Sequence, residues 1–293
     1  MISCIITTYR REPDILCRAL ESIINQTYKD IEIIIVNDAP EYKELSIRLE
    51  NAVSAYKANI KFINHSKNMG ACAARNTGIK YANGEYVAFL DDDDEWMPEK
   101  LEEQLKIIEK YKVALVYCDH YFVDSKHNYH YKKVCLKHLE GKNDYERLLC
   151  FNYIGSTSFP LINLSILKGV GGFNTKLKSS QDHEVWLKIA KSNDIYYVQK
   201  PLVKYYYTDV AITRSIENRE QGYNYLLEEF KEDYHKNSKI LQCRYILLSV
   251  TYFGIKKIKQ GLYYWKQAFK INPFSFKNLY VFRRVLEKLI FKS

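Results

Sequence analysis

The sequence lacks several features that mark common classes of protein. Its seven cysteines are scattered without a C-x-x-C pair, and their odd number indicates a reduced protein. No stretch reaches the roughly 18 apolar residues of a membrane-spanning helix, and no basic segment precedes the first apolar run as in a secretory signal. No glycine-rich loop follows the first predicted strand, which disfavours a dinucleotide cofactor or a P-loop. We therefore expect a cytoplasmic protein.

Acidic residues are scarce in the C-terminal segment. From Lys256 to Ser293 there are ten lysines and arginines and one acid, Glu287, so this segment carries the whole net charge of +9. Its lysines could be solvated while its aromatic residues pack on the rest of the chain. Alternatively, the segment could bind an anionic membrane surface, such as the inner face of the plasma membrane, at roughly 1 kcal/mol per basic residue. We expect no nucleic-acid partner, because no recognised module accompanies the charge.

The regular pattern in the chain is an alternation of strands and helices, which predicts an α/β fold. A length of 293 residues favours one large domain with an appendage. The predicted strands are Ile2–Thr8, Ile31–Val36, Ile60–His65, Tyr86–Leu90, Val113–Cys118, Ile195–Val198 and Val203–Tyr207. The predicted helices are Pro13–Asn25, Glu41–Tyr56, Gly70–Tyr81, Glu99–Tyr111, Asp182–Lys191, Glu217–Tyr234, Leu241–Phe253, Lys257–Lys270 and Phe276–Phe291.

Polar residues lie at the ends of three of the predicted strands, where α/β sheets bind their ligands. The first of these clusters is Thr7–Arg10, the second is Asn37 with Asp38, and the third is an aspartate run. Four consecutive aspartates, Asp91–Asp94, follow Tyr86–Leu90. Stacked carboxylates favour a hard divalent cation, although an acidic turn that caps the helix near Pro98 is an alternative. Asp38 ends the second strand, where it could hydrogen-bond a ribose or a base, or could simply be a turn aspartate.

Several segments together resemble the GT-A fold glycosyltransferases of family 2, over Ile2 to about Ser215. The matching segments are Ile5–Tyr9, Gln26–Tyr28, Ile33–Asp38, Asn68–Ile79, Gly84–Trp96, Gly171–Phe173 and Gln181–Leu187. The resemblance implies a GT-A domain, a Rossmann-like mixed sheet with helices on both faces, over 1–215. Residues 1–118 would form its nucleotide-binding half and 119–215 its acceptor half, followed by a basic, aromatic-rich helical extension over 216–293.

The resemblance also implies the roles of individual residues. Asp93 would bind Mn²⁺ or Mg²⁺ on the diphosphate of a nucleotide sugar, with Asp91 and Asp92 near the ribose and the metal-bound waters. Asp94 and Glu95 are expected to serve the following helix. The residues that would hold the nucleotide sugar are Thr8, Tyr9, Asp38, Arg75, Asp91 and Asp92. Without the resemblance, Arg75 would be read as a surface residue of its helix.

Asp182 matches the position of the catalytic base of inverting members of the family. Such a base takes the proton of the acceptor hydroxyl as that hydroxyl attacks. An alternative role for Asp182 is to cap its helix. Two departures from the family pattern are Gln181, where glutamate is usual, and the absence of histidine from Tyr205–Asp209.

The expected function is transfer of a sugar from a UDP-sugar to a growing surface glycan, such as a capsule, lipopolysaccharide or teichoic acid, with a lipid-linked acceptor. A non-catalytic nucleotide-sugar-binding or glycan-binding scaffold is the main alternative. A phosphotransfer or nucleotidyl-transfer enzyme would leave Arg75 and Asp182 unexplained. The donor sugar is not readable from the sequence, because the region expected to select it, Tyr117–Phe159, is irregular.

Overall fold

The computed structural model describes residues 1–124, 128–132, 143–206 and 215–274. These residues form two compact units. The first contains the described residues of 1–139 and 153–223, and the second contains those of 140–152 and 224–293. The predicted helix Phe276–Phe291 lies outside the described residues, as do Tyr207, Thr208 and Asp209.

The first unit is built on one sheet with the strand order β3-β2-β1-β4-β8-β6-β9-β5, and β7 pairs with the free part of β6. Its strands are β1 (Ile2–Thr8), β2 (Ile31–Asn37), β3 (Ile60–Asn64), β4 (Tyr86–Asp91), β5 (Glu95–Trp96), β6 (Leu115–Val123), β7 (Tyr129–Lys132), β8 (Leu161–Asn163) and β9 (Ile195–Tyr206). The first four strands are parallel, whereas β8 runs antiparallel between β4 and β6. The sheet is therefore mixed, as expected.

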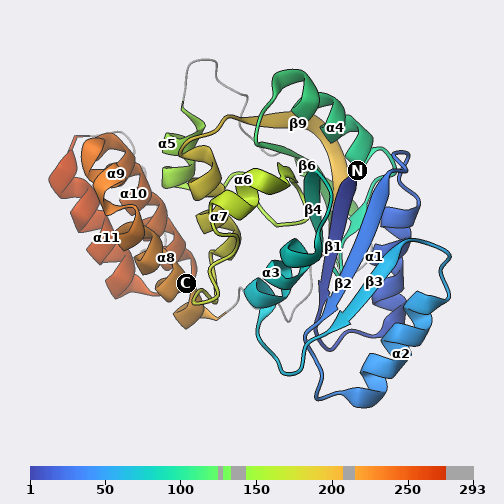
Figure 1. Ribbon diagram of the computed structural model, residues 1–293. Helices are drawn as coiled ribbons and strands as arrows, with labels where there is room; N and C mark the ends of the chain where they lie inside the picture. The colour runs from blue at the N-terminus through green and yellow to red at the C-terminus, as the bar shows by residue number, and fades with distance from the viewer. Residues whose placement is uncertain (125–127, 133–142, 207–214, 275–293) are drawn as a thin grey trace. The chain divides into compact units, whose positions relative to one another are not determined.

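The helices of this unit are α1 (Pro13–Ile24), α2 (Lys43–Ser54), α3 (Ala71–Tyr81), α4 (Lys100–Tyr111), α6 (Leu164–Gly169) and α7 (Gln181–Ala190). The chain moves outward from β1 to β3 and then returns to β4. Because such crossovers are right-handed, this reversal places α1 and α3 on opposite faces of the sheet, as Figure 1 shows. Gly78 lets α3 approach β1 closely, since a Cβ there would lie 2.5 Å from Ile5 Cγ2.

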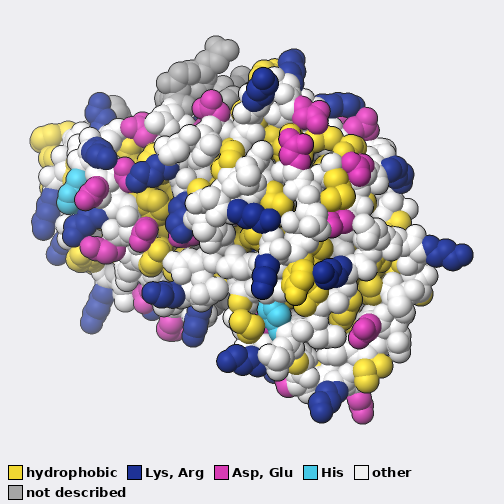
Figure 2. All heavy atoms as spheres, in the orientation of Figure 1, with side chains coloured by type: hydrophobic (Ala, Val, Ile, Leu, Met, Phe, Trp, Pro, Cys, Tyr) yellow, Lys and Arg dark blue, Asp and Glu magenta, His cyan; other side chains and the backbone are white. Residues whose placement is uncertain are grey.

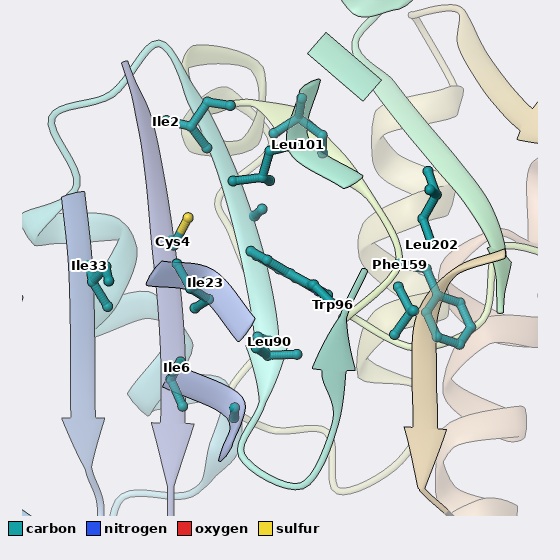
Figure 3. Close-up of a cluster of buried hydrophobic side chains, with 14 of the residues drawn as sticks. Ile2, Cys4, Ile6, Ile23, Ile33, Leu90, Trp96, Leu101, Phe159 and Leu202 are labelled. Carbon is teal, nitrogen blue, oxygen red and sulfur yellow. The ribbon is translucent and has the colours of Figure 1, made fainter. Parts of the chain in front are cut away.

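The core of the first unit lies between the sheet and α1 and α4. Figure 3 shows Trp96 in the middle of this cluster, between Leu90 and Phe159. Trp96 is 3% exposed, and its indole Nε1 donates to Ser158 O at 2.9 Å. This bond satisfies the one polar group of the largest apolar side chain in the region, so the ring can be buried without an unpaired donor.

The parallel register aligns the ends of three strands. Thr7 lies beside Val36 of β2 and Asp91 of β4, and Thr8 lies beside Asn37. Asp38 N then donates to Thr8 O at 2.9 Å, which extends the pairing by one residue. The polar residues that follow these strands are thereby brought to one edge of the sheet.

Three of the predicted elements are wrong in detail. The strands predicted at Ile195–Val198 and Val203–Tyr207 form one strand, β9, which continues through irregular pairing with β6 around Asp119. The helix predicted at Glu217–Tyr234 is broken at Phe230 into α8 (Ile216–Glu229) and α9 (Lys231–Lys236).

The second unit is helical. It contains α5 (Asp144–Cys150), α9, α10 (Ser238–Gly254), α11 (Ile258–Ile271) and the last residues of α8. Ser249 Oγ of α10 donates to Gly261 O of α11 at 2.9 Å, and Tyr252 stacks on Tyr264 with ring centroids 5.5 Å apart. These contacts hold α10 and α11 together as a helical hairpin.

Candidate active site

Asp91, the last residue of β4, is held by three side chains from distant parts of the chain. Its Oδ1 accepts from Arg75 Nη2 at 2.9 Å and from Thr157 Oγ1 at 3.1 Å, and its Oδ2 accepts from Ser156 Oγ at 3.1 Å. The guanidinium of Arg75 supplies the opposite charge. The orientation of Asp91 is therefore fixed by the protein's own side chains.

Asp92 and Asp93 share a second arginine. Arg11 Nη2 donates to Asp92 Oδ1 at 2.7 Å and to Asp93 Oδ2 at 3.0 Å. Burial, together with the charges of Asp92 and Asp91, raises the pKa of Asp93 to about 6 in spite of Arg11. A nearby cation would therefore stabilise the ionised form of Asp93.

Asp94 and Glu95 do not serve the following helix, so that expectation is wrong. The Asp94 carboxylate is fully buried, and it accepts from Ser158 Oγ at 2.6 Å and from Tyr206 N at 3.1 Å. Glu95 lies in β5 and pairs with Arg18 and Lys204. The N-cap of α4 is Glu99, which makes no side-chain cap. The capping alternative for the aspartate run is therefore wrong as well.

Asp38 fastens the loop that leads into α3. Its Oδ1 accepts from Met69 N at 2.8 Å and contacts His65 Nδ1 at 2.7 Å, and its Oδ2 accepts from Gly70 N at 2.7 Å. His65 Nε2 in turn contacts Thr77 Oγ1 of α3 at 2.8 Å. Asp38 is thus more than a turn residue, because it positions the start of the helix that carries Arg75.

Thr8 and Tyr9 lie beside Asp38 at the same edge of the sheet. Thr8 is 3% exposed, and its Oγ1 has no hydrogen-bond partner among the described residues. A buried hydroxyl without a partner costs about 1–3 kcal/mol, which a bound ligand would recover. Tyr9 is 39% exposed, and its ring contacts the guanidinium of Arg10.

Arg75 is not a surface residue of its helix, so that alternative is wrong. Its side chain is 11% exposed and spans two parts of the site. While Nη2 donates to Asp91, Nη1 donates to Gln181 Oε1 at 3.1 Å. One side chain therefore connects the aspartate run to the residue next to Asp182.

Gln181 makes two hydrogen bonds that account for an amide at this position. Its Oε1 accepts from Arg75, and its Nε2 donates to Leu177 O at 2.8 Å. A glutamate could not make the second bond, because a carboxylate has no donor. The departure from the family pattern at this position is thus compatible with an intact site.

Asp182 lies in the first turn of α7, whose N-cap is Ser180 with φ +59°. The side chain is partly exposed, and its Oδ1 accepts from the backbone N of His183 at 2.8 Å. Asp182 is therefore not the N-cap of α7. A carboxylate in the first turn of a helix is stabilised by the helix dipole, which favours the ionised form that a base requires.

Tyr205 lies near all of these carboxylates. Burial raises its pKa, and the charges of Asp94, Asp91, Asp93 and Asp182 raise it further. The aspartate run and Asp182 therefore act electrostatically on one phenol. Tyr205 occupies the segment in which the sequence shows no histidine.

No group of three or more His, Cys, Asp or Glu side chains within the described residues could hold a metal ion unaided. A metal at Asp93 would thus need further ligands from a bound molecule and from water. This arrangement is typical of Mg²⁺ and Mn²⁺ at phosphates. The donor set of Asp91, Asp92 and Asp93 fits a hard cation, because carboxylate oxygens are the ligands that such ions prefer.

Sequence reasoning missed several residues of this site. They are Arg11, Arg18, His65, Ser156, Thr157 and Ser158. The three hydroxyl residues are consecutive and follow an apolar stretch, which is a signal for a binding loop. Nothing in the local sequence pairs them with aspartates more than 60 residues away.

A search against protein families matches residues 3–170 to the model described as "Glycosyl transferase family 2". An uncharacterized glycosyltransferase of Rickettsia typhi is 30% identical over 244 residues, which cover 82% of this chain and 74% of that protein. A putative colanic acid biosynthesis glycosyl transferase of Escherichia coli, WcaA, is 28% identical over 249 residues, covering 83% of this chain and 85% of the relative.

Solved structures of similar fold include the 1–349 fragment of S. aureus TarS with UDP-GlcNAc. Its TM-score is 0.65 at 17% identity, over 86% of this chain and 72% of that one. A mannosyltransferase of Pyrobaculum calidifontis with GDP-Man and Mn²⁺ has a TM-score of 0.63 at 15% identity, over 99% and 81% of the two chains. The fold is accordingly that of the GT-A glycosyltransferases. On the sequence match, the chain belongs to glycosyl transferase family 2.

Proposed function

We propose that this glycosyltransferase moves a sugar from a UDP-sugar to a hydroxyl group of a growing surface glycan, with inversion at the anomeric carbon. The observation that carries the proposal is the pair of hydrogen bonds from Arg75 to Asp91 and Gln181. These bonds bring the aspartate run and Asp182 to one place. Departure of the diphosphate and attack of the hydroxyl occur at the same carbon, so their catalytic groups must be neighbours.

The aspartate run would receive the diphosphate end of the donor. Asp93 would hold Mn²⁺ or Mg²⁺, and Asp91 and Asp92 would contact the ribose and the metal-bound waters. When bound, the ion supplies positive charge to the leaving diphosphate. The raised pKa of Asp93, which burial and its acidic neighbours cause, fits a site that gains from a cation.

The nucleoside would lie over the ends of β1 and β2. Thr8 offers a hydroxyl that has no hydrogen-bond partner among the described residues, Tyr9 an exposed ring and Asp38 a fixed carboxylate. The UDP-GlcNAc bound by the similarly folded TarS fragment supports uridine as the nucleoside. The GDP-Man complex of the mannosyltransferase makes guanosine donors the first control.

Asp182 would be the general base. It would take the proton of the acceptor hydroxyl as that oxygen attacks from the face opposite the diphosphate. Arg75 and Gln181 would fix the start of α7, so the carboxylate of Asp182 keeps its position. Gly222 of α8 also packs against this start, since a Cβ there would lie 2.8 Å from Ser179 O.

The acceptor would be a lipid-linked glycan, and the second unit would rest on the membrane that carries it. The similarity to WcaA, a putative glycosyl transferase of colanic acid biosynthesis, supports a polysaccharide acceptor. None of the described helices is long and apolar enough to cross a membrane. Any attachment through these helices would therefore be at the surface.

The surface in question lies on α11. Residues 256–274 contain five lysines and no acid. Leu262 and Phe269 of α11 are exposed beside Lys266 and Lys270. Figure 2 shows lysine and arginine side chains along the edge where α11 lies in Figure 1. Apolar side chains among lysines are the pattern of a helix that binds anionic lipid.

Vesicle sedimentation tests this attachment. We expect the protein to bind vesicles that contain phosphatidylserine and not vesicles of phosphatidylcholine alone. Replacing Lys259, Lys266 and Lys270 by glutamine should weaken binding at least about tenfold, because each lysine contributes roughly 1 kcal/mol. The same change at Lys57, Lys80 and Lys112 of the first unit is the control. If the variant at Lys259, Lys266 and Lys270 bound these vesicles as tightly as the control variant, this part of the proposal would be contradicted.

Release of UDP from a panel of UDP-sugars, with Mn²⁺ and without acceptor, tests the activity itself. We expect release from at least one UDP-sugar and not from GDP-mannose, and its loss in Asp93→Ala. Ser165→Ala, a surface change on α6, is the control. Absence of turnover with every donor would support the scaffold alternative and would contradict the proposal.

A further inference from the structure

Arg11 makes the closest side-chain contact of opposite charge to the carboxylates of the aspartate run. Its Nε and Nη2 donate to Asp92 Oδ1 at 2.9 and 2.7 Å, and Nη2 also donates to Asp93 Oδ2 at 3.0 Å. The side chain is 28% exposed, so it is open to solvent on one side. One guanidinium thus contacts two adjacent carboxylates and offsets part of their charge.

The backbone places Arg11 at this position. The chain turns after β1 at Arg10, which has φ +54°, and Pro13 then opens α1. Arg11 lies in this short turn and not within a helix or strand. Among the described residues, the hydrogen bonds to Asp92 and Asp93 are the contacts that hold its guanidinium in place.

The other two arginines of the site are held differently. Arg75 is 11% exposed and is bound to Gln181 as well as to Asp91. Arg18 lies in α1, donates to the backbone oxygen of Asp93 at 2.7 Å and pairs with Glu95 at 3.2 Å. Its guanidinium also lies 4.0 Å from the centroid of the Tyr206 ring. Both keep partners outside the aspartate carboxylates, whereas the partners of Arg11 among the described residues are Asp92 and Asp93.

The carboxylates that Arg11 contacts are those that the proposed function gives to a metal ion and its waters. Two positive charges cannot share these oxygens without repulsion. A guanidinium released from a carboxylate pairs well with phosphate, which it can contact through two N–H groups.

We propose that Arg11 is an exchangeable counter-ion, which pairs with Asp92 and Asp93 in the empty site and with the donor diphosphate in the filled site. This inference rests on the proposed function. It assigns Arg11 two opposite effects. Arg11 opposes binding of the metal alone and favours binding of the nucleoside diphosphate.

Binding measurements on the full chain test the exchange without any turnover. The variants are Arg11→Gln and Arg11→Lys, with Arg48→Gln as the matched control. Arg48 lies on α2 and pairs with Glu12 at 2.8 Å, so its loss removes the same charge away from the aspartates. Free Mn²⁺ is followed by its electron paramagnetic resonance signal, UDP binding at saturating Mn²⁺ by calorimetry, and folding by circular dichroism.

For Arg11→Gln we expect Mn²⁺ without nucleotide to bind about tenfold more tightly and UDP to bind about tenfold more weakly, since one charge-assisted contact changes in each case. Arg11→Lys should lie between it and the wild type, and Arg48→Gln should match the wild type. A role in folding alone would not move the two affinities in opposite directions. Unchanged affinities, or a shift of both in the same direction, would overturn the exchange. A wild-type protein that binds neither Mn²⁺ nor UDP would overturn the proposed function together with it.

Discussion

Single residues join the two halves of the site, and Arg75 is the clearest example. It reaches Asp91 at the end of β4 and Gln181 at the start of α7, which are 90 residues apart in the sequence. The planar guanidinium makes both contacts because its N–H groups diverge within one plane. A residue of the same charge and different shape should therefore not replace it.

For Arg75→Lys we predict a fall in kcat of about tenfold or more, because an ammonium cannot bridge Asp91 and Gln181 as a fork does. The melting temperature should change little, since the charge beside Asp91 is kept. Initial rates of sugar transfer and a thermal scan measure the two effects. A lysine variant with wild-type kcat would show that the bridge is not needed.

Gln181→Glu supplies a second test at this scale. The carboxylate would lose the donor to Leu177 O and place a negative charge next to Asp182. Because a like charge disfavours ionisation, we predict that the acidic limb of the kcat profile moves to higher pH. The pH dependence of transfer at saturating donor gives the answer, with Gln181→Met as the uncharged control. If the acidic limb lay at the same pH in both variants, ionisation of Asp182 would not control kcat.

Among single residues, the positions of consecutive polar residues in the fold could be predicted from the sequence. Asp91–Asp94 are consecutive and follow an apolar strand, so their place at a sheet edge could be inferred. The separate roles of these four aspartates could not be inferred from the sequence. Asp94 is turned into the core by Ser158 and Tyr206, which are far away in the sequence. Arg11 was missed for the same reason, because its partners lie more than 80 residues away.

Among the elements, α4 carries an unusual buried charge. Lys100 is fully buried, its Nζ donates to Gln104 Oε1 at 2.7 Å and lies 4.3 Å from the centroid of the Trp96 ring. Gln104 Nε2 donates to Val116 O and Phe159 O. These bonds tie α4 to β6 and to the loop before β8. Burial lowers the pKa of Lys100 to about 8.

Because its pKa is lowered, Lys100 destabilises the folded protein at neutral pH and does so less as the pH rises. In the unfolded chain Lys100 titrates near pH 10.5, so below pH 8 the folded state must keep a buried charge that the unfolded state solvates. The cost, roughly 3 kcal/mol, is complete below pH 8 and disappears as the pH rises toward 10.5. Lys100→Met removes it.

We therefore predict that the free energy of unfolding of Lys100→Met exceeds that of the wild type by more at pH 7 than at pH 9.5. Urea unfolding at the two pH values measures this double difference, in which the loss of the bond to Gln104 cancels. Lys106→Met, at an exposed position of the same helix, is the control. A double difference of zero would show that Lys100 has the same pKa in the folded and the unfolded protein, which would contradict the lowered pKa.

The elements that could be predicted are those with a clear period or a long apolar run. β1, β2 and β4 are buried on both faces, and α1 has one apolar stripe. The short strands β5 and β8 have two and three residues, which is too short for a pattern. They are strands because β9 and β4 pair with them. The break at Phe230 likewise has no proline or glycine to mark it.

Over the whole molecule, the candidate catalytic residues and the excess of positive charge lie in different parts of the chain. The residues of the candidate site belong to the first unit, and the five lysines of 256–274 belong to the second. The family match over residues 3–170 lies within the segment that the sequence motifs had indicated. The extent of the glycosyltransferase domain to residue 215 stays a prediction.

The central claim is that Asp182 and the aspartate run act together in an inverting transfer. Its most direct test is the transfer reaction of Asp182→Asn, followed by nuclear magnetic resonance of the product anomer, with UDP affinity measured alongside. We predict an inverted product from the wild type. In the variant, transfer should be at least about a hundredfold slower, because the base is lost. UDP affinity should stay unchanged. A product of retained configuration, or a variant as fast as the wild type, would contradict the account.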